Sequence, residues 1–219
     1  MNRGRFEQIW EPIAQDIREE IIAGKLHPGQ RLKVLDISTK YGVSNTPVRE
    51  AFRHLAMEGF VQNIPRKMVV VKEISYKEVE DFYAIQEVLE GLAARLAVRN
   101  SSQTLLKKLQ NLQGRMARHL EEGNLEKFIK VNQDFHQCII NASANEKLIQ
   151  ITRNLRDQIQ RFRSIMLHHA GRGKESLQEH EKILEALEAQ DAEKCEVQVK
   201  RHIQNAAELL KKIIEQESP

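Results

Sequence analysis

Three of the eight histidines in this 219-residue chain occur among apolar residues of three different predicted helices. Their apolar neighbours on the same helix face are Phe128, Ile129, Ile139 and Ile140 for His136, Leu177, Ile183, Leu184 and Leu187 for His180, and Cys195, Val199, Ala206 and Leu209 for His202. A single inward histidine is ordinarily a hydrogen-bonded core residue. Three imidazoles in one core are harder to satisfy, because a buried polar group without a partner destabilises the fold. One divalent metal ion would bind all three, with zinc or nickel as first choices and iron or manganese as second.

A fourth ligand should lie one helical turn from His136, on the same face of its helix. That position is Asn132. Asp134 is only two residues from His136 and should point elsewhere. Since an amide oxygen is neutral, Asn132 would be a weaker ligand than an aspartate.

A second candidate site is the stretch VSNTPVREAFRHLAMEGF, Val43 to Phe60, which predicts an amphipathic helix with a small, polar entrance. Ser44 is placed to cap the helix, and Pro47 suits its first turn, where a missing N–H is tolerated. Thr46 and the backbone N–H groups at this end favour a phosphate. Such an entrance is typical of a helix that enters the DNA major groove.

Two arginines follow this entrance on the same helix. Arg49 lies one turn in, at the depth of guanine O6 and N7, and Arg53 lies one turn further, where a backbone phosphate is the expected partner. The inner face of the helix is formed by Val48, Ala51, Phe52, Leu55 and Ala56. Arginines on the surface of an amphipathic helix are the alternative interpretation, but the preceding short helix and the basic hairpin that follows favour DNA binding.

Residues 1–72 contain the elements that would position this helix. Helices are predicted over Glu7–Ala23, Val34–Tyr41 and Thr46–Glu58, followed by a two-stranded hairpin of Val61–Ile64 and Met68–Val71. The turn of the hairpin carries Arg66 and Lys67. These residues hold 12 Lys and Arg against 8 Asp and Glu, whereas residues 73–219 hold 22 against 23. The order and the basic charge predict a winged helix-turn-helix DNA-binding domain.

Residues 73–219 read as helices alone. Ser75, with Glu78 three residues later, forms a capping box. Helices are predicted from there to Val98 and over Gln103–Glu121, Leu125–Ala142, Glu146–Met166, Glu175–Ala189 and Ala192–Glu215. Short connections between amphipathic helices indicate an antiparallel all-α bundle of about six helices. The fold class is therefore mainly α, with a small β-wing in the first domain.

The composition excludes several classes of protein. Every apolar run is far shorter than a membrane-spanning helix, and the N-terminus lacks the apolar segment of a signal peptide. Cys138 and Cys195, the two cysteines, do not suggest a disulfide framework. We therefore expect a cytoplasmic protein that does not associate with membranes.

The segment HPGQRLKVLDISTKYGVSNTPVREAFRHLAMEGFV closely resembles the winged-helix domain of GntR-type bacterial transcription regulators. The resemblance implies that Arg31, Thr46, Arg49 and the wing contact a DNA operator. Asn45 stands where the family usually has an arginine, and because asparagine pairs best with adenine, a changed base preference is expected. Met68 replaces the usual wing glycine.

The segments NQDFHQCIINASAN, LQEHEKILEALEAQDAEK and VKRHI resemble the effector domain of the FadR subfamily of these regulators, called FCD. The resemblance implies that His136, His180 and His202, with Asn132, hold a metal ion. It also implies that a carboxylate effector binds near the first bundle helix. Gln86 stands where the family has an arginine for this carboxylate, so Arg163 is a candidate to compensate. Alternatively, Gln86 simply hydrogen-bonds Glu90.

Together these patterns predict a bacterial transcriptional regulator, specifically a repressor, that binds a palindromic operator as a homodimer. Its operator affinity would depend on a small carboxylate effector bound at or near a divalent transition metal. The rival hypotheses are a metalloenzyme that uses the three histidines and a helical bundle in which a metal is only structural. No general base, nucleophile motif or phosphate loop accompanies the histidines, so an enzyme is not expected.

Overall fold

The computed structural model describes residues 9–64, 68–153, 155, 162 and 171–217. Arg66, Lys67 and Arg163, three of the predicted site residues, lie outside the described residues. The chain divides into two compact units, one ending at Ile74 and the other beginning at Ser75.

The N-terminal unit combines three helices with a small sheet. The helices are α1 (Trp10–Ile22), α2 (Val34–Tyr41) and α3 (Asn45–Met57). The isoleucine stripe of α1 and the predicted inner face of α3 meet in one apolar core with residues of the sheet. The core includes Ile13, Ile17, Ile21, Val48, Ala51, Phe52, Leu55, Phe60, Val61 and Val71. This arrangement leaves the opposite face of α3 on the surface of the unit.

The sheet has three antiparallel strands in the order β1-β3-β2, not the two predicted from the sequence. Strands β2 (Val61–Ile64) and β3 (Met68–Val71) form the expected hairpin. The additional strand β1 (Arg31–Leu32) pairs with Val70 and Val69 of β3. Such a short strand cannot show a period-2 pattern, so it is not predictable from its own sequence.

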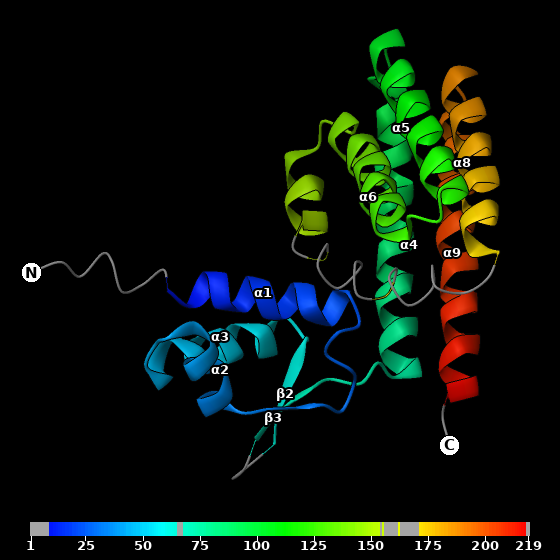
Figure 1. Cartoon of the computed structure of the whole chain (residues 1–219). Coiled ribbons are helices and arrows are strands. Elements are labelled where there is room, and N and C mark those ends of the chain that lie inside the picture. Colours follow the sequence, from blue (N-terminus) through cyan, green and yellow to red (C-terminus); the bar gives the residue numbers. More distant parts are fainter. Residues whose placement is uncertain (1–8, 65–67, 154, 156–161, 163–170, 218–219) are drawn as a thin grey trace, which may run out of the picture. The chain divides into compact units, whose positions relative to one another are not determined.

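The C-terminal unit is an all-α bundle, as predicted. Its helices are α4 (Tyr76–Arg99), α5 (Gln103–Glu121), α6 (Leu125–Ala142), α8 (Arg172–Glu188) and α9 (Ala192–Glu217), and residues 146–153 are also helical. Figure 1 labels these five helices. Their main packing contacts follow the order α4, α9, α8, α5, α6 and back to α4. Among the described residues, every helix is too short or too polar to span a lipid bilayer.

The ends of these helices follow local chemistry. The Ser75 hydroxyl accepts the Glu78 backbone N–H at 3.1 Å, as the capping box predicts, and opens α4. Helix α8 begins at Arg172 rather than at the predicted Glu175. The two glycines of the sequence GRG predict a connection there. Gly171 instead takes a positive φ of 92° immediately before the helix, and Gly173 lies inside its first turn.

Candidate DNA-binding helix and candidate metal centre

Helix α3 presents one polar stripe on its exposed face. Asn45, Arg49 and Arg53 are four residues apart and therefore lie one above another along the helix. All three are exposed, as are Thr46 in the first turn and Arg31 in β1. The structure thus brings Asn45, Arg49 and Arg53 together on one accessible face.

Ser44 occupies the position before α3, as expected, but its side chain makes no capping hydrogen bond to the described residues of the helix. The prediction that Ser44 caps the helix through its hydroxyl is therefore wrong. A capping oxygen accepts an N–H from the second or third residue of the helix. Because α3 starts at Asn45, its third residue is Pro47, which has no N–H.

Arg53 does not extend freely from the helix. Its Nη2 donates to Glu50 Oε1 at 2.6 Å, and its Nε donates to both oxygens of the same carboxylate at 3.2 Å. Both side chains are exposed enough to be screened by water. Such a pair can open, so the contact is compatible with a phosphate taking the place of Glu50.

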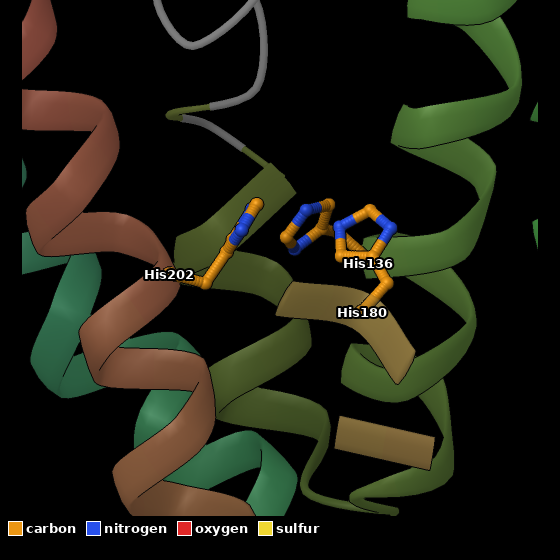
Figure 2. Close-up of side chains that lie close together, drawn as sticks. All are labelled: His136, His180 and His202. Carbon is orange, nitrogen blue, oxygen red and sulfur yellow. The ribbon is translucent and has the colours of Figure 1, made fainter. Parts of the chain in front are cut away.

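In the bundle, the three histidines converge from three helices. His136 comes from α6, His180 from α8 and His202 from α9, and the rings point toward one another (Figure 2). The distances between ring centroids are 5.3 Å for His136 and His180, 5.0 Å for His136 and His202, and 4.7 Å for His180 and His202. All three are buried. One nitrogen from each ring lies within 4.8 Å of the others.

These spacings fit a metal site after a small contraction. Nitrogen ligands of a tetrahedral ion with bonds of about 2.0–2.1 Å are about 3.3 Å apart. On α6, Asn132 lies one turn before His136, and its buried Oδ1 has no hydrogen-bond partner among the described residues. A buried oxygen of this kind is what an additional metal ligand requires. The residues present therefore fit a divalent ion.

Two of the histidines are oriented by carboxylates that the sequence pattern did not place in the site. His136 Nδ1 lies 2.8 Å from Glu90 Oε2, and His202 Nδ1 lies 2.6 Å from Glu179 Oε2. An ionised carboxylate only accepts hydrogen bonds, so with an ionised partner each Nδ1 would carry the proton and each Nε2 would be the metal-binding nitrogen. Metal-ligating histidines commonly have such carboxylate partners.

Glu179 is ionised because of its neighbours. Burial by itself raises the pKa of Glu179, but in the metal-free protein the hydrogen bonds and positive charges of His202 and Arg172 outweigh burial and lower its pKa to about 2. Asn205 donates a further hydrogen bond at 2.7 Å to the other carboxylate oxygen. In the sequence, the one feature that could have pointed to Glu179 as a site residue is its position directly before His180.

Gln86 joins the network around the other carboxylate. Its Nε2 donates to Glu90 Oε1 at 2.7 Å, so Gln86, Glu90 and His136 form a buried chain of hydrogen bonds. The structure therefore shows the hydrogen bond between Gln86 and Glu90 that the sequence offered as an alternative, with the Gln86 amide nitrogen as the donor. Gln86 Oε1 is buried and has no hydrogen-bond partner in the described part of the chain, which leaves an acceptor for a ligand.

Both units match known protein families. Residues 10–71 match the family described as bacterial regulatory proteins, gntR family, and residues 81–205 match the FCD domain. The chain is a GntR-family regulator with an FCD domain. The matched ranges hold the candidate DNA-binding helix and the three histidines, respectively.

Two relatives and one solved structure support the assignment to transcriptional regulators. The chain is 29% identical over 214 residues to the HTH-type transcriptional repressor RspR of Escherichia coli, covering 97% of this chain and 91% of RspR. It is 28% identical over 189 residues to the HTH-type transcriptional regulator McbR of the same species, covering 84% of each chain. The solved structure of E. coli McbR/YncC matches with a TM-score of 0.77 at 25% identity, covering 94% of this chain and 98% of that one.

These findings place the protein among transcription regulators and not among enzymes. The metalloenzyme considered from the sequence is therefore not supported. GntR-family regulators bind DNA. The exposed face of α3 lies in the part of the chain that matches this family, and the histidine cluster lies in the FCD domain of the same regulator.

Proposed function

We propose that this regulator is a homodimeric repressor whose affinity for a palindromic operator depends on a small carboxylate effector bound beside a divalent metal ion. The observation that carries the proposal is the convergence of three buried histidines, two of them oriented by carboxylates. The E. coli relative RspR is named a repressor, which supports the direction of control.

His136, His180 and His202 would hold the ion, with Asn132 as a further ligand. Zinc or nickel suits three imidazoles best, and iron or manganese would also fit. The bound ion would supply open positions for oxygen atoms of an effector. Glu90 and Glu179 hold two of the imidazole rings in position, and Gln86 offers an acceptor next to Glu90.

An effector can alter DNA binding only if it prefers one of two conformations of the dimer. Effector that releases the operator must bind the DNA-free state more tightly, and by linkage the operator must weaken effector binding by the same factor. A ligand that binds the bundle without changing operator affinity would refute this coupling between effector and operator.

Metal analysis tests the site directly. Wild-type protein purified without chelators should contain one divalent transition metal per chain, measured by mass spectrometry, and His180→Ala should lose it. His119→Ala is the matched control, because His119 lies on α5 and belongs to no metal cluster among the described residues. An absence of metal from both wild-type and His119→Ala protein would refute the metal site.

The DNA contacts are tested with selected binding sites. Arg49→Ala should lose about 1–3 kcal/mol of discrimination at one base pair of each half-site. Asn45→Arg should shift the selected sequence at the position read by residue 45, from a preference for adenine toward guanine. Identical selected sites for wild-type and Asn45→Arg protein would refute the role of Asn45.

A further inference from the structure

Arg172 is a buried arginine that neither family resemblance nor periodicity pointed to. It is the first residue of α8, and its side chain is only 4% exposed. The side chain runs along its own helix, because Nη2 donates to Glu179 Oε2 at 2.9 Å, seven residues further on. The guanidinium therefore lies at the level of Glu179, next to the histidine cluster.

One half of this guanidinium is not satisfied. Arg172 Nη1 is buried and has no hydrogen-bond partner among the described residues. Glu175 Oε2 lies 3.8 Å from Nη1, and the Glu175 side chain is 67% exposed. That separation is beyond hydrogen-bonding distance. A buried, charged donor without an acceptor is unfavourable, and a ligand that supplies the acceptor would remove this cost.

Glu179 is poorly placed to satisfy both arms of Arg172. One of its oxygens accepts from His202 and from Arg172 Nη2, and the other accepts from Asn205 Nδ2. A fork-like pair, in which two nitrogens of arginine meet two oxygens of one carboxylate, is therefore not formed within the described network. The second arm of the fork remains available to a different carboxylate.

We propose that Arg172 binds the carboxylate of the effector through Nη1 while Nη2 stays on Glu179. The inference rests on the proposed function and names a residue and a ligand class for it. A single carboxylate, that of Glu179, separates the guanidinium from His202. A small carboxylate on Nη1 would thus lie beside the histidines and carry its charge into the same network.

Arg172 can also provide the positive charge that is missing at position 86. With Gln86 on α4, the first bundle helix brings no positive charge to a carboxylate ligand at that position. The guanidinium of Arg172 can supply that charge from α8, a different helix of the bundle. Because Nη2 remains on Glu179, ligand binding should reinforce the contact that orients His202, so metal and carboxylate should bind cooperatively.

Calorimetric titration with acetate, malonate and succinate tests the proposal, with acetamide and malonamide as uncharged analogues at equal ionic strength. Wild-type protein should bind at least one of the three carboxylates but neither amide. Arg172→Gln should weaken binding about 10-fold or more, as expected for the loss of a charge-assisted hydrogen bond. Glu175→Gln is the matched control, and it should bind as tightly as wild type or more tightly, because it removes a nearby negative charge.

Metal content, circular dichroism and operator binding of every variant separate the possible failures. Arg172→Lys, which keeps the charge without the fork, serves if Arg172→Gln does not fold, and it should also bind more weakly than wild type. Wild-type affinity in either folded arginine variant would overturn the proposal, as would a wild-type protein that binds none of the probes. Simultaneous loss of metal and carboxylate binding in both variants would also overturn it, because Arg172 would then act only through Glu179. A metal-free wild type whose carboxylate binding needs Arg172 would refute the metal centre alone.

Discussion

At the scale of single residues, Glu179 combines two tasks in one carboxylate. It fixes the ring of His202 at 2.6 Å and neutralises the buried Arg172. A carboxylate with a lowered pKa stabilises the folded state at pH values above its unfolded pKa, and this stabilisation disappears as the pH falls through the folded pKa. For Glu179 that window extends from its ordinary pKa of 4.5 down to about 2.

Glu179→Gln should therefore destabilise the metal-free protein in a pH-dependent way. The full shift corresponds to about 3 kcal/mol, and partial exposure to solvent reduces the expected loss to about 1–2 kcal/mol at pH 6. The difference from wild type should shrink as the pH is lowered to 3, measured by urea unfolding in the presence of a chelator. Glu185→Gln, an exposed glutamate of α8, is the control. An equal difference at both pH values would contradict this account of Glu179.

Asn132 gives a second test at this scale. Asn132→Asp should tighten metal binding about 10-fold or more, because a carboxylate is a stronger oxygen ligand for a divalent cation than an amide. Without metal, the same variant should be less stable than wild type, since it buries a charge. Competition with a chelator and thermal unfolding measure the two effects. If Asn132→Asp left metal affinity unchanged, residue 132 would not be a ligand.

At the scale of helices and strands, periodicity predicted which side chains of one element share a face, but not which side chains of other elements they contact. The inner face of α3 and the inward direction of the three histidines follow from helical spacing and were predicted. Strand β1 was not, because so short a strand carries no pattern and only its pairing with β3 defines it. The hydrogen bond between Glu90 and His136 depends on the packing of α4 against α6, which no spacing within one helix reveals.

Two glycines of the bundle allow a matched test of helix packing. A Cβ at Gly173 of α8 would lie 2.6 Å from Cδ1 and 3.2 Å from Cδ2 of Leu120 on α5, so both branches of this half-buried side chain would have to shift. A Cβ at Gly91 of α4 would lie 2.7 Å from Cε of Lys200, a flexible chain that can swing toward solvent. Helix propensity favours alanine over glycine by about 1 kcal/mol in a helix interior.

Gly91→Ala should therefore leave the protein as stable as wild type or stabilise it by up to about 1 kcal/mol. Gly173→Ala should destabilise it by about 0.5–2 kcal/mol, because overpacking outweighs the smaller propensity gain at a helix start. Denaturant unfolding of the two variants side by side measures the contrast. Equal stability of both variants would show that α8 does not need the close approach to α5.

At the scale of the whole molecule, a palindromic operator requires two copies of the chain, because one winged helix reads only a half-site. The bundle offers an apolar stripe for this purpose. Ile85, Val88 and Leu92 are spaced three and four residues apart and therefore lie on one face of α4. Their exposed fractions are 55%, 54% and 40%, respectively. Because clustered apolar side chains on a surface are typical of an interface between proteins, we expect this stripe to contribute the centre of the dimer contact.

Val88→Glu should therefore convert the proposed dimer to a monomer at micromolar concentration, measured by light scattering. A charge forced into the centre of an apolar interface weakens association by about 10-fold or more. Operator affinity should fall with it, while binding to an isolated half-site should remain at the wild-type level, since α3 is unchanged. Glu80→Arg, an exposed change on α4 away from the stripe, should leave the dimer intact. A Val88→Glu protein that stays dimeric and binds the full operator normally would place the dimer contact elsewhere.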